Sequence, residues 1–207
     1  MMFSLFLKPY LRSIRAILKY RSSLIDPRAQ ISLDSILRGN NYVGPHASVM
    51  SSIIGKYSYV GGKSELGFCT IGRYVSIAPS VTIGLQSHDL TRLSTFPAFS
   101  YDNQIASRHL KSAEQRSYNY KHTIVDADVW IGHSALIMAG VHIGIGSVVG
   151  AGSIVTKDLE PFGIYVGSPA KLMRKRFNDQ LINTLLESRW WELDFADASN
   201  LLNSINV

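Results

Sequence analysis

This sequence of 207 residues lacks the means to form an internal disulfide bond, and it lacks any long apolar run. Cys69 is its single cysteine, which fits a reducing compartment. No stretch approaches the roughly 20 uninterrupted apolar residues that a membrane-spanning helix needs. Basic residues also interrupt the apolar residues near the beginning, unlike the core of a secretory signal. We therefore expect a cytoplasmic protein.

Acidic residues are missing from the first 25 positions, so most of the net charge of +6 lies in this N-terminal segment. The first acid is Asp26, and the basic residues before it are Lys8, Arg12, Arg15, Lys19 and Arg21. The rest of the chain is close to neutral. The composition therefore argues against a nucleic-acid-binding surface that extends across the whole protein.

Residues 3–21 are predicted to form an amphipathic helix within an N-terminal segment, 1–25. Apolar residues such as Phe3, Leu7 and Tyr10 recur at spacings of three and four, and basic residues line another face. One interpretation is a helix that packs on the rest of the chain or on a partner subunit. The other is a helix that lies on an anionic membrane surface, which would place the protein at the inner face of the membrane.

The sequence does contain an aliphatic residue at every sixth position over long stretches. The C-terminal stretch of this kind consists of Val125, Ile131, Ile137, Ile143, Val149 and Val155. A period of six is neither the 3.6 of a helix nor the 2 of a simple strand. It is typical of a β-helix, in which each hexad forms one flat face and a turn. Such short strands bury a continuous core only when they stack.

The same period appears earlier in the chain. Its members are Ile31, Leu37, Val43, Val49, Ile54, Val60, Leu66, Ile71, Ile77 and Ile83. Two hexads have five residues, at 49–53 and 66–70, and small residues recur at the fourth following position. Strands of an ordinary sandwich would not hold one register for so long. We predict one β-helix domain over residues 26–175.

Two segments depart from the period. Residues 86–122 form a long insertion that is rich in polar and aromatic residues, and such loops on rigid scaffolds commonly carry binding or catalysis. A purely structural loop is the alternative. After Leu159 the chain is expected to leave the coil through Pro161 and Gly163. A helical tail, 176–207, would then begin at Asn178 or Asp179, add a second helix near 197–205, and close the open end of the column.

Particular motifs resemble the left-handed β-helix acyltransferases. They are DVWIG at 128–132, GAGSIVTKD at 150–158 and GSPAK at 167–171. The insertion, which begins near GLQSH at 84–88, and the tail with Trp190-Trp191 resemble one branch in particular. That branch contains the xenobiotic acetyltransferases and the sugar O-acetyltransferases of surface-polysaccharide pathways. The resemblance implies an all-β, left-handed parallel β-helix, a homotrimer, and acetyl-CoA bound in the groove between two β-helices, without a metal.

The resemblance also implies a catalytic residue. His88 matches the loop histidine that acts as general base in the family. An acceptor hydroxyl is a poor nucleophile until its proton is removed, and imidazole titrates near neutral pH. Asp89 could orient His88, although adjacent side chains often point apart. His109 and His122 match no family position. A backbone N–H would suit the oxyanion, but the sequence does not identify it.

Six cofactor-binding residues follow from the galactoside-type acetyltransferases of the same family. Trp130 would lie beside the thiol of CoA, and Ala151 would offer its backbone to the pantetheine. Thr156, Lys157 and Arg174 would lie near the adenosine and the phosphates. His133 stands where that group often has serine, which weakens its assignment. The structural alternatives are a corner-capping role for Trp130 and solvated surface charges for the two cations.

The leading functional hypothesis is acetyl-CoA-dependent O-acetylation of a sugar in lipopolysaccharide, capsule or exopolysaccharide biosynthesis. Alternatives are N-acetylation of a nucleotide-linked amino sugar and O-acetylation of an antibiotic. A different class is a non-catalytic solenoid that only binds. A zinc-dependent carbonic anhydrase would need converging histidines, whereas His133 and His142 occupy different points in their hexads. The acceptor and the acyl length beyond acetyl are not determined by the sequence.

Overall fold

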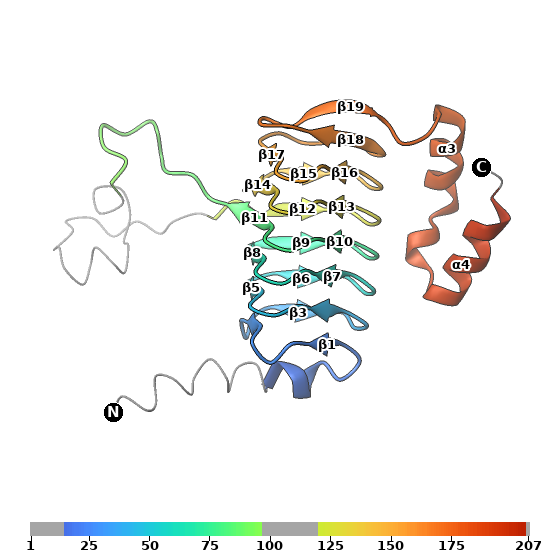
Figure 1. The fold of residues 1–207 in the computed structure, drawn as a ribbon, viewed down its shortest axis with the longest axis horizontal. Helices are drawn as coiled ribbons and strands as arrows, with labels where there is room; N and C mark the ends of the chain where they lie inside the picture. The colour runs from blue at the N-terminus through green and yellow to red at the C-terminus, as the bar shows by residue number, and fades with distance from the viewer. Residues whose placement is uncertain (1–14, 97–119, 206–207) are drawn as a thin grey trace.

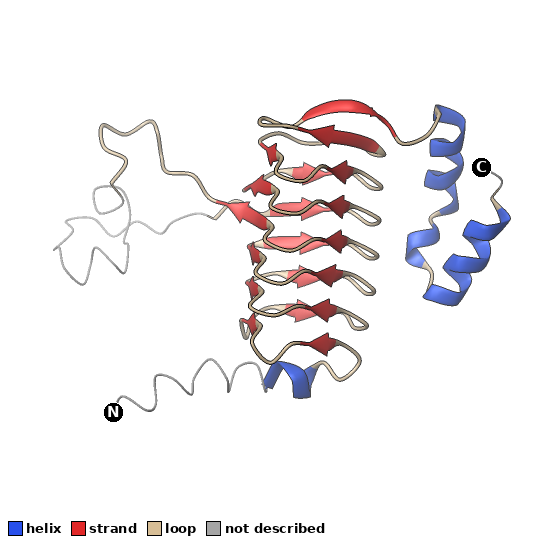
Figure 2. Cartoon of the chain, viewed as in Figure 1, coloured by secondary structure: helices blue, strands red, loops and turns tan. Residues whose placement is uncertain are grey.

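The chain forms a column of stacked coils (Figure 1). The computed structural model describes residues 15–96 and 120–205. Within these residues, successive short strands pass to three different sheets, which we call faces A, B and C. Strands build the column, and helices lie at its N-terminal end and along one side (Figure 2). Each coil therefore runs from face A to face B to face C.

Each face is a ladder of strands that are parallel except for the last strand of face A. Face A contains β1 (Leu24–Ile25), β4 (Tyr42–Val43), β7 (Tyr59–Val60), β10 (Ser76–Ile77), β13 (Trp130–Ile131), β16 (Val148–Val149), β18 (Gly163–Val166) and the antiparallel β19 (Lys171–Lys175). Face B contains β2 (Gln30–Ile31), β5 (Ser48–Met50), β8 (Glu65–Gly67), β11 (Thr82–Leu85), β14 (Leu136–Met138) and β17 (Ile154–Val155). Face C contains β3 (Ile36–Leu37), β6 (Ile53–Ile54), β9 (Cys69–Ile71), β12 (Thr123–Val125) and β15 (His142–Ile143).

The residues of the six-residue period form the core. On face B, for example, Ile31 pairs with Val49 and Val49 with Leu66, and all three side chains point inward and are buried. Burying one such side chain stabilises the fold by roughly 1.5–3 kcal/mol, so the stacked rows supply most of the driving force. The prediction of a β-helix from the period is confirmed.

Small side chains at the corners complete the hydrogen bonding between coils. The buried hydroxyl of Ser58 donates to the carbonyl of Gly72 at 2.7 Å and accepts from the backbone N–H of Val75 at 2.9 Å. Ser64 does the same one face further on, with Ala78 and Val81. Each serine therefore satisfies backbone groups that the short strands leave unpaired where the chain turns.

Departures from the period fall at one corner, between faces B and C, which we call the BC corner. Both five-residue hexads end there, because Val49 lies on face B and Ile54 on face C, as do Leu66 and Ile71. The insertion leaves from β11 and returns at β12, at the same corner. The other two corners, CA and AB, keep the six-residue spacing over the coils before Leu159.

The end of the column differs from the expectation. The chain does not leave the coil at Pro161 but continues along face A through β18, where Tyr165 is buried. The cause is a shortened passage at the BC corner: Leu159, only four residues after Val155, takes the next inward place, above Ile143. Tyr165 then follows six residues later. Residues 167–170 form the turn that joins β18 to β19.

The N-terminal segment packs beneath the first coil as far as the structure describes it. Residues 15–19 are helical, and Ala16 and Tyr20 are buried. The Tyr20 hydroxyl donates to the carbonyl of Ser35 at 2.8 Å. Lys8 and Arg12 lie outside the described residues. Among residues 15–96 and 120–205, no helix has the length and apolar character to cross a membrane.

The helical tail lies along the CA corner rather than over the open end of the column (Figure 1). It contains α3 (Asp179–Ser188), the short helix η2 (Trp190–Glu192) and α4 (Phe195–Ser204). Asn178 caps α3 as predicted, since its side-chain oxygen accepts from the N–H of Leu181 at 2.9 Å. Aromatic side chains form the contact between the tail and this corner. Trp190 packs against Tyr74, with ring centroids 5.3 Å apart.

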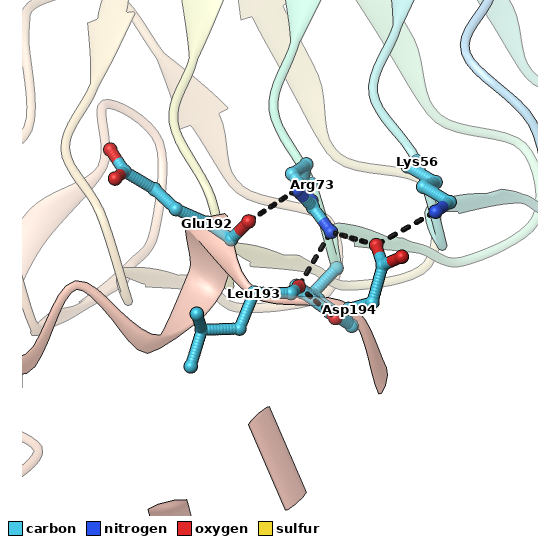
Figure 3. A network of polar contacts seen from close by, with 6 residues as sticks. Lys56, Arg73, Glu192, Leu193 and Asp194 are labelled. Carbon is cyan, nitrogen blue, oxygen red and sulfur yellow. Dashed lines mark hydrogen bonds and ion pairs between the residues drawn. The ribbon is translucent and has the colours of Figure 1, made fainter. Parts of the chain in front are cut away.

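Arg73 connects the helical tail to the coils through hydrogen bonds and an ion pair (Figure 3). Its guanidinium donates to the carbonyls of Glu192 at 2.7 Å and Leu193 at 2.5 Å, and pairs with the carboxylate of Asp194 at 3.0 Å. Lys56 pairs with the same carboxylate at 2.7 Å. The hydrogen bond from Lys56 lowers the pKa of Asp194, so this contribution is present at neutral pH and is lost as the pH falls below the ordinary carboxyl range.

Replacing Arg73 should loosen the tail. We expect Arg73→Ala to lower the free energy of unfolding by about 3 kcal/mol, because it removes charged hydrogen bonds to two carbonyls and a carboxylate. Urea denaturation measures this change, and limited trypsin digestion should cut the tail faster. The matched control is Arg38→Ala, at an exposed position on the same corner below the tail. Equal effects of the two substitutions would contradict the role of Arg73 in holding the tail.

Candidate functional site

The base of the insertion is held together at the BC corner. The side chain of Gln86 donates to the carbonyl of Lys121 at 3.1 Å and accepts from its N–H at 3.3 Å. Tyr120 stacks on Phe68 from the coil below, with ring centroids 3.9 Å apart. The first and last described segments of the insertion therefore lie side by side where they join the column.

His88 lies on the outgoing segment, and its side chain is exposed. The imidazole Nδ1 is 2.7 Å from the carbonyl oxygen of Thr95. A carbonyl only accepts hydrogen bonds, so Nδ1 must carry the proton of the neutral ring. The other nitrogen, Nε2, then has its lone pair available. This arrangement suits a general base, with the Thr95 carbonyl fixing both the tautomer and the ring orientation.

The neighbouring candidates have other roles in the loop. The carboxylate of Asp89 accepts from the N–H of Thr91 at 3.0 Å and from its hydroxyl at 2.6 Å, and it pairs with Arg92 at 3.5 Å. These contacts stabilise the turn after His88. His122 meets the hydroxyl of Thr70 at 2.8 Å, near the base of the loop. His109 lies outside the described residues.

Trp130 and Arg174 lie on one groove of about 470 Å³ along the upper half of face A. The Trp130 side chain is 53% exposed. Outward-facing Val148 and Ile164 separate it from Arg174 on successive strands, and they give the groove an apolar floor. Three strand spacings amount to roughly 14 Å. An extended chain such as pantetheine can therefore lie along this floor with a cation at its far end.

The other four predicted cofactor residues lie at two corners. His133 and Ala151 are exposed at the AB corner, where the N–H of Gly152 donates to the carbonyl of His133 at 2.8 Å. Thr156 and Lys157 are exposed at the BC corner, two coils beyond the insertion. Two coils correspond to roughly 10 Å along the column. Lys157 therefore lies on the same side as His88, whereas Arg174 lies over face A.

Sequence reasoning missed an ion pair at the wall of the groove. Arg176 donates to the carboxylate of Asp128 at 2.9 Å and to the carbonyl of Gly146. Burial raises the pKa of Asp128, opposed by the hydrogen bond from Arg176. Asp128 was part of a quoted motif but had no assigned role, because its partner is 48 residues away in sequence.

The histidines considered for a metal lie on different sides of the column. His133 is at the AB corner, whereas His142 lies on face C and contacts the carboxylate of Asp126 at 2.9 Å. Within the described ranges, no three histidine, cysteine or carboxylate side chains gather as a metal site would require. The geometry offers a base and an elongated groove as its chemical features.

Comparison with known proteins finds relatives among the acetyltransferases, three of which follow. A chloramphenicol acetyltransferase of Klebsiella aerogenes is 43% identical over 124 residues, which is 60% of this chain and 56% of that protein. One from Agrobacterium fabrum is 36% identical over 167 residues, 67% of this chain and 74% of that protein. A probable macrolide acetyltransferase of Lysinibacillus sphaericus is 35% identical over 136 residues, 65% and 72%. This chain thus spans little more than half the length of the Klebsiella protein. No protein-family model matches the chain.

Solved structures share the fold at low sequence identity. A variant of AntD, an N-acyltransferase from Bacillus cereus, has a TM-score of 0.56 and 22% identity, covering 84% of this chain and 96% of that one. PerB from Caulobacter crescentus has a TM-score of 0.53 and 19% identity, covering 79% and 66%. Both were solved with CoA and a nucleotide-linked sugar. Their likeness confirms the predicted left-handed parallel β-helix.

Proposed function

Because the chain belongs to the hexapeptide-repeat acetyltransferases, we propose that it transfers acetyl from acetyl-CoA to a sugar hydroxyl in surface-polysaccharide biosynthesis. The observation that carries the proposal is the His88 ring, whose Nδ1 is bonded to the Thr95 carbonyl and whose Nε2 can take a proton. The groove with Trp130 and Arg174 supports a long donor such as acetyl-CoA. The product would be an O-acetylated lipopolysaccharide, capsule or exopolysaccharide precursor.

The reaction would need two proton transfers, one addition to the thioester carbonyl and one expulsion of the CoA thiolate. His88 Nε2 removes the proton of the acceptor hydroxyl as its oxygen bonds to the thioester carbon. The tetrahedral intermediate then expels the CoA sulfur, which receives the proton from the imidazolium. The carbonyl of Thr95 stabilises the cationic ring, because it accepts from Nδ1–H throughout.

The placement of the cofactor residues favours a site shared between copies of the chain. His88, Thr156 and Lys157 lie at the BC corner, whereas Trp130 and Arg174 lie on face A. One side of the column separates these groups by roughly 15–20 Å, since each side spans five or six residues. A single acetyl-CoA can contact both groups only where two copies meet. A homotrimer places such a junction at every neighbouring pair.

Two alternatives have specific support. The relatives are named for acetylating chloramphenicol and macrolides, which favours an antibiotic acceptor. AntD and PerB were solved with nucleotide-linked sugars, which favours an amino-sugar acceptor and N-acetylation. Release of free CoA in the presence of simple glycosides, amino sugars or chloramphenicol distinguishes the three.

A cytoplasmic enzyme at the inner membrane surface is part of the same proposal. The predicted helix 3–21 would contribute its basic face. In the described part, Arg15 and Lys19 are exposed while Ala16 packs on the coil, so packing and membrane contact are compatible.

His88 should be essential for turnover. His88→Ala is expected to lower kcat by roughly two to four orders of magnitude, the usual contribution of a general base, while acetyl-CoA binds with nearly unchanged affinity. Steady-state kinetics and calorimetric titration measure the two quantities. The control is His142→Ala, on exposed face C, which should retain full turnover. A loss below about tenfold in His88→Ala would show that another group is the base.

The protein should be a trimer in solution. Light scattering at micromolar concentration is expected to give three times the mass of one chain. The physical reason is that the donor-binding groups of one chain lie on opposite sides of the column, so one donor molecule cannot contact both groups on the same copy. A monomer with full activity would contradict a site that is shared between two copies of the chain.

Lys157 and Arg174 should act on donor binding rather than on chemistry. Each substitution to Ala is expected to raise the KM for acetyl-CoA by about five- to fiftyfold with kcat within about threefold, because phosphate charges do not change in the reaction. The effect should shrink for acetylated pantetheine, which lacks the nucleotide. Lys63→Asn is the control, since this exposed lysine has φ of +60°, which Asn tolerates. Equal losses with both donors would show that these cations do not bind the phosphates.

A further inference from the structure

The groove on face A changes its chemistry along its length. Its upper end is formed by Ile164 and the exposed cation Arg174. Its lower end, below Trp130, is formed by Ser76 with Tyr74 beside it, and Asp128 lines one side on the coil of Trp130. The charge of Asp128 is balanced by Arg176, which lines the same side, whereas Arg174 pairs with no carboxylate among the described residues. The two ends therefore fit two different chemical groups.

The carboxylate of Asp128 is held in one orientation. Arg176 engages its Oδ2 at 2.9 Å, and the Asp128 backbone N–H donates to the carbonyl of Arg73 at 3.0 Å. Among the described residues, no donor meets its other oxygen, Oδ1. Because a carboxylate only accepts, this oxygen suits a ligand hydroxyl or N–H.

Ser76 lies directly beside Trp130, since the two residues are paired across β10 and β13. Its side chain points out of the column, and in the described part of the chain its hydroxyl has no hydrogen-bond partner. The nearby Tyr74 hydroxyl is already used, since it donates to the carbonyl of Leu193 at 2.8 Å. An exposed indole, a free hydroxyl and a fixed carboxylate thus meet at one place.

We propose that the lower end of this groove binds the sugar ring of the acceptor, with Trp130 against the ring and Asp128 and Ser76 on its hydroxyls. The proposal rests on the proposed function, which puts the acetyl group beside Trp130. The second carboxylate oxygen can accept from the hydroxyls of a neutral polyol, and Arg176 is already paired with this carboxylate, so it is not free to bind an anionic group at this point. Arg176 is a positioning residue, because it acts on the ligand through Asp128.

The test uses the intact protein and three small acceptors: methyl β-galactoside, methyl α-glucoside and chloramphenicol. Saturation-transfer NMR measures their binding, and calorimetry measures acetyl-CoA binding separately. At least one methyl glycoside should bind. Ser76→Ala should weaken it about fivefold, as expected for one hydrogen bond of about 1 kcal/mol. Asp128→Asn should weaken it tenfold or more, and acetyl-CoA affinity should stay within twofold in Ser76→Ala.

The matched control is Ser48→Ala, which removes an outward hydroxyl from the first position of a strand on face B. Equal glycoside binding by Ser76→Ala and Ser48→Ala would overturn the proposal, even if Asp128→Asn fails to fold. The proposal would also be overturned if the wild type bound neither glycoside. The same holds if Ser76→Ala weakened the binding of chloramphenicol but not that of a glycoside. If the wild type does not bind acetyl-CoA, the proposed function is contradicted. Glycoside binding that is weakened by Ser76→Ala would still support the sugar site in that case.

Discussion

Stacking of one coil directly on the next is the constraint on which the rest of the molecule depends. Each strand has only two to four residues over most of the column, so it is held by hydrogen bonds to the coils above and below. Inward side chains must lie above side chains of similar shape, as Ile77 lies between Val60 and Ile131. Glycine permits the closest backbone approach: a Cβ on Gly55 would lie 2.3 Å from the carbonyl oxygen of Gly72. A coil of this kind tolerates change only where it turns.

That tolerance is unequal among the three corners, and the inequality positions the candidate site. The BC corner accepts hexads of five residues, the passage of four residues to Leu159 and the whole insertion, so it is the corner from which His88 extends. The CA corner carries aromatic side chains that bind the helical tail, and Arg73 secures it there. Face A, which lies between the CA and AB corners, keeps regular strands and offers the groove. The candidate base and the groove are therefore both positioned by the same rigid column.

The fold could be read from the sequence because its cause is local and repeated. Six-residue spacing identified the inward residues, and Asn178 marked the start of α3. What sequence reasoning missed depends on contacts between distant residues. The chain was expected to leave the coil after Leu159, although Leu159 takes the next inward place and the coil continues. Arg73 meets Asp194 across 121 residues, and Asp128 meets Arg176 across 48 residues, so neither pair leaves a local signal. The positions of His88 and Trp130 came from resemblance, whereas the hydrogen bond that sets the His88 tautomer required coordinates.

The rigidity that stabilises the column also decides how a site can be built on it. A flexible protein can close around its substrate, but stacked coils cannot bend to bring the BC corner toward face A. Residues on two sides of the column can act on one molecule only if a second copy supplies one of the two sides. The groove then orients what lies between them, because Arg174 at its upper end favours an anionic group, whereas Asp128 and Ser76 beside Trp130 favour hydroxyls. A ligand with phosphates at one end and its reactive acyl group at the other therefore has one favourable direction, with the acyl group toward Trp130.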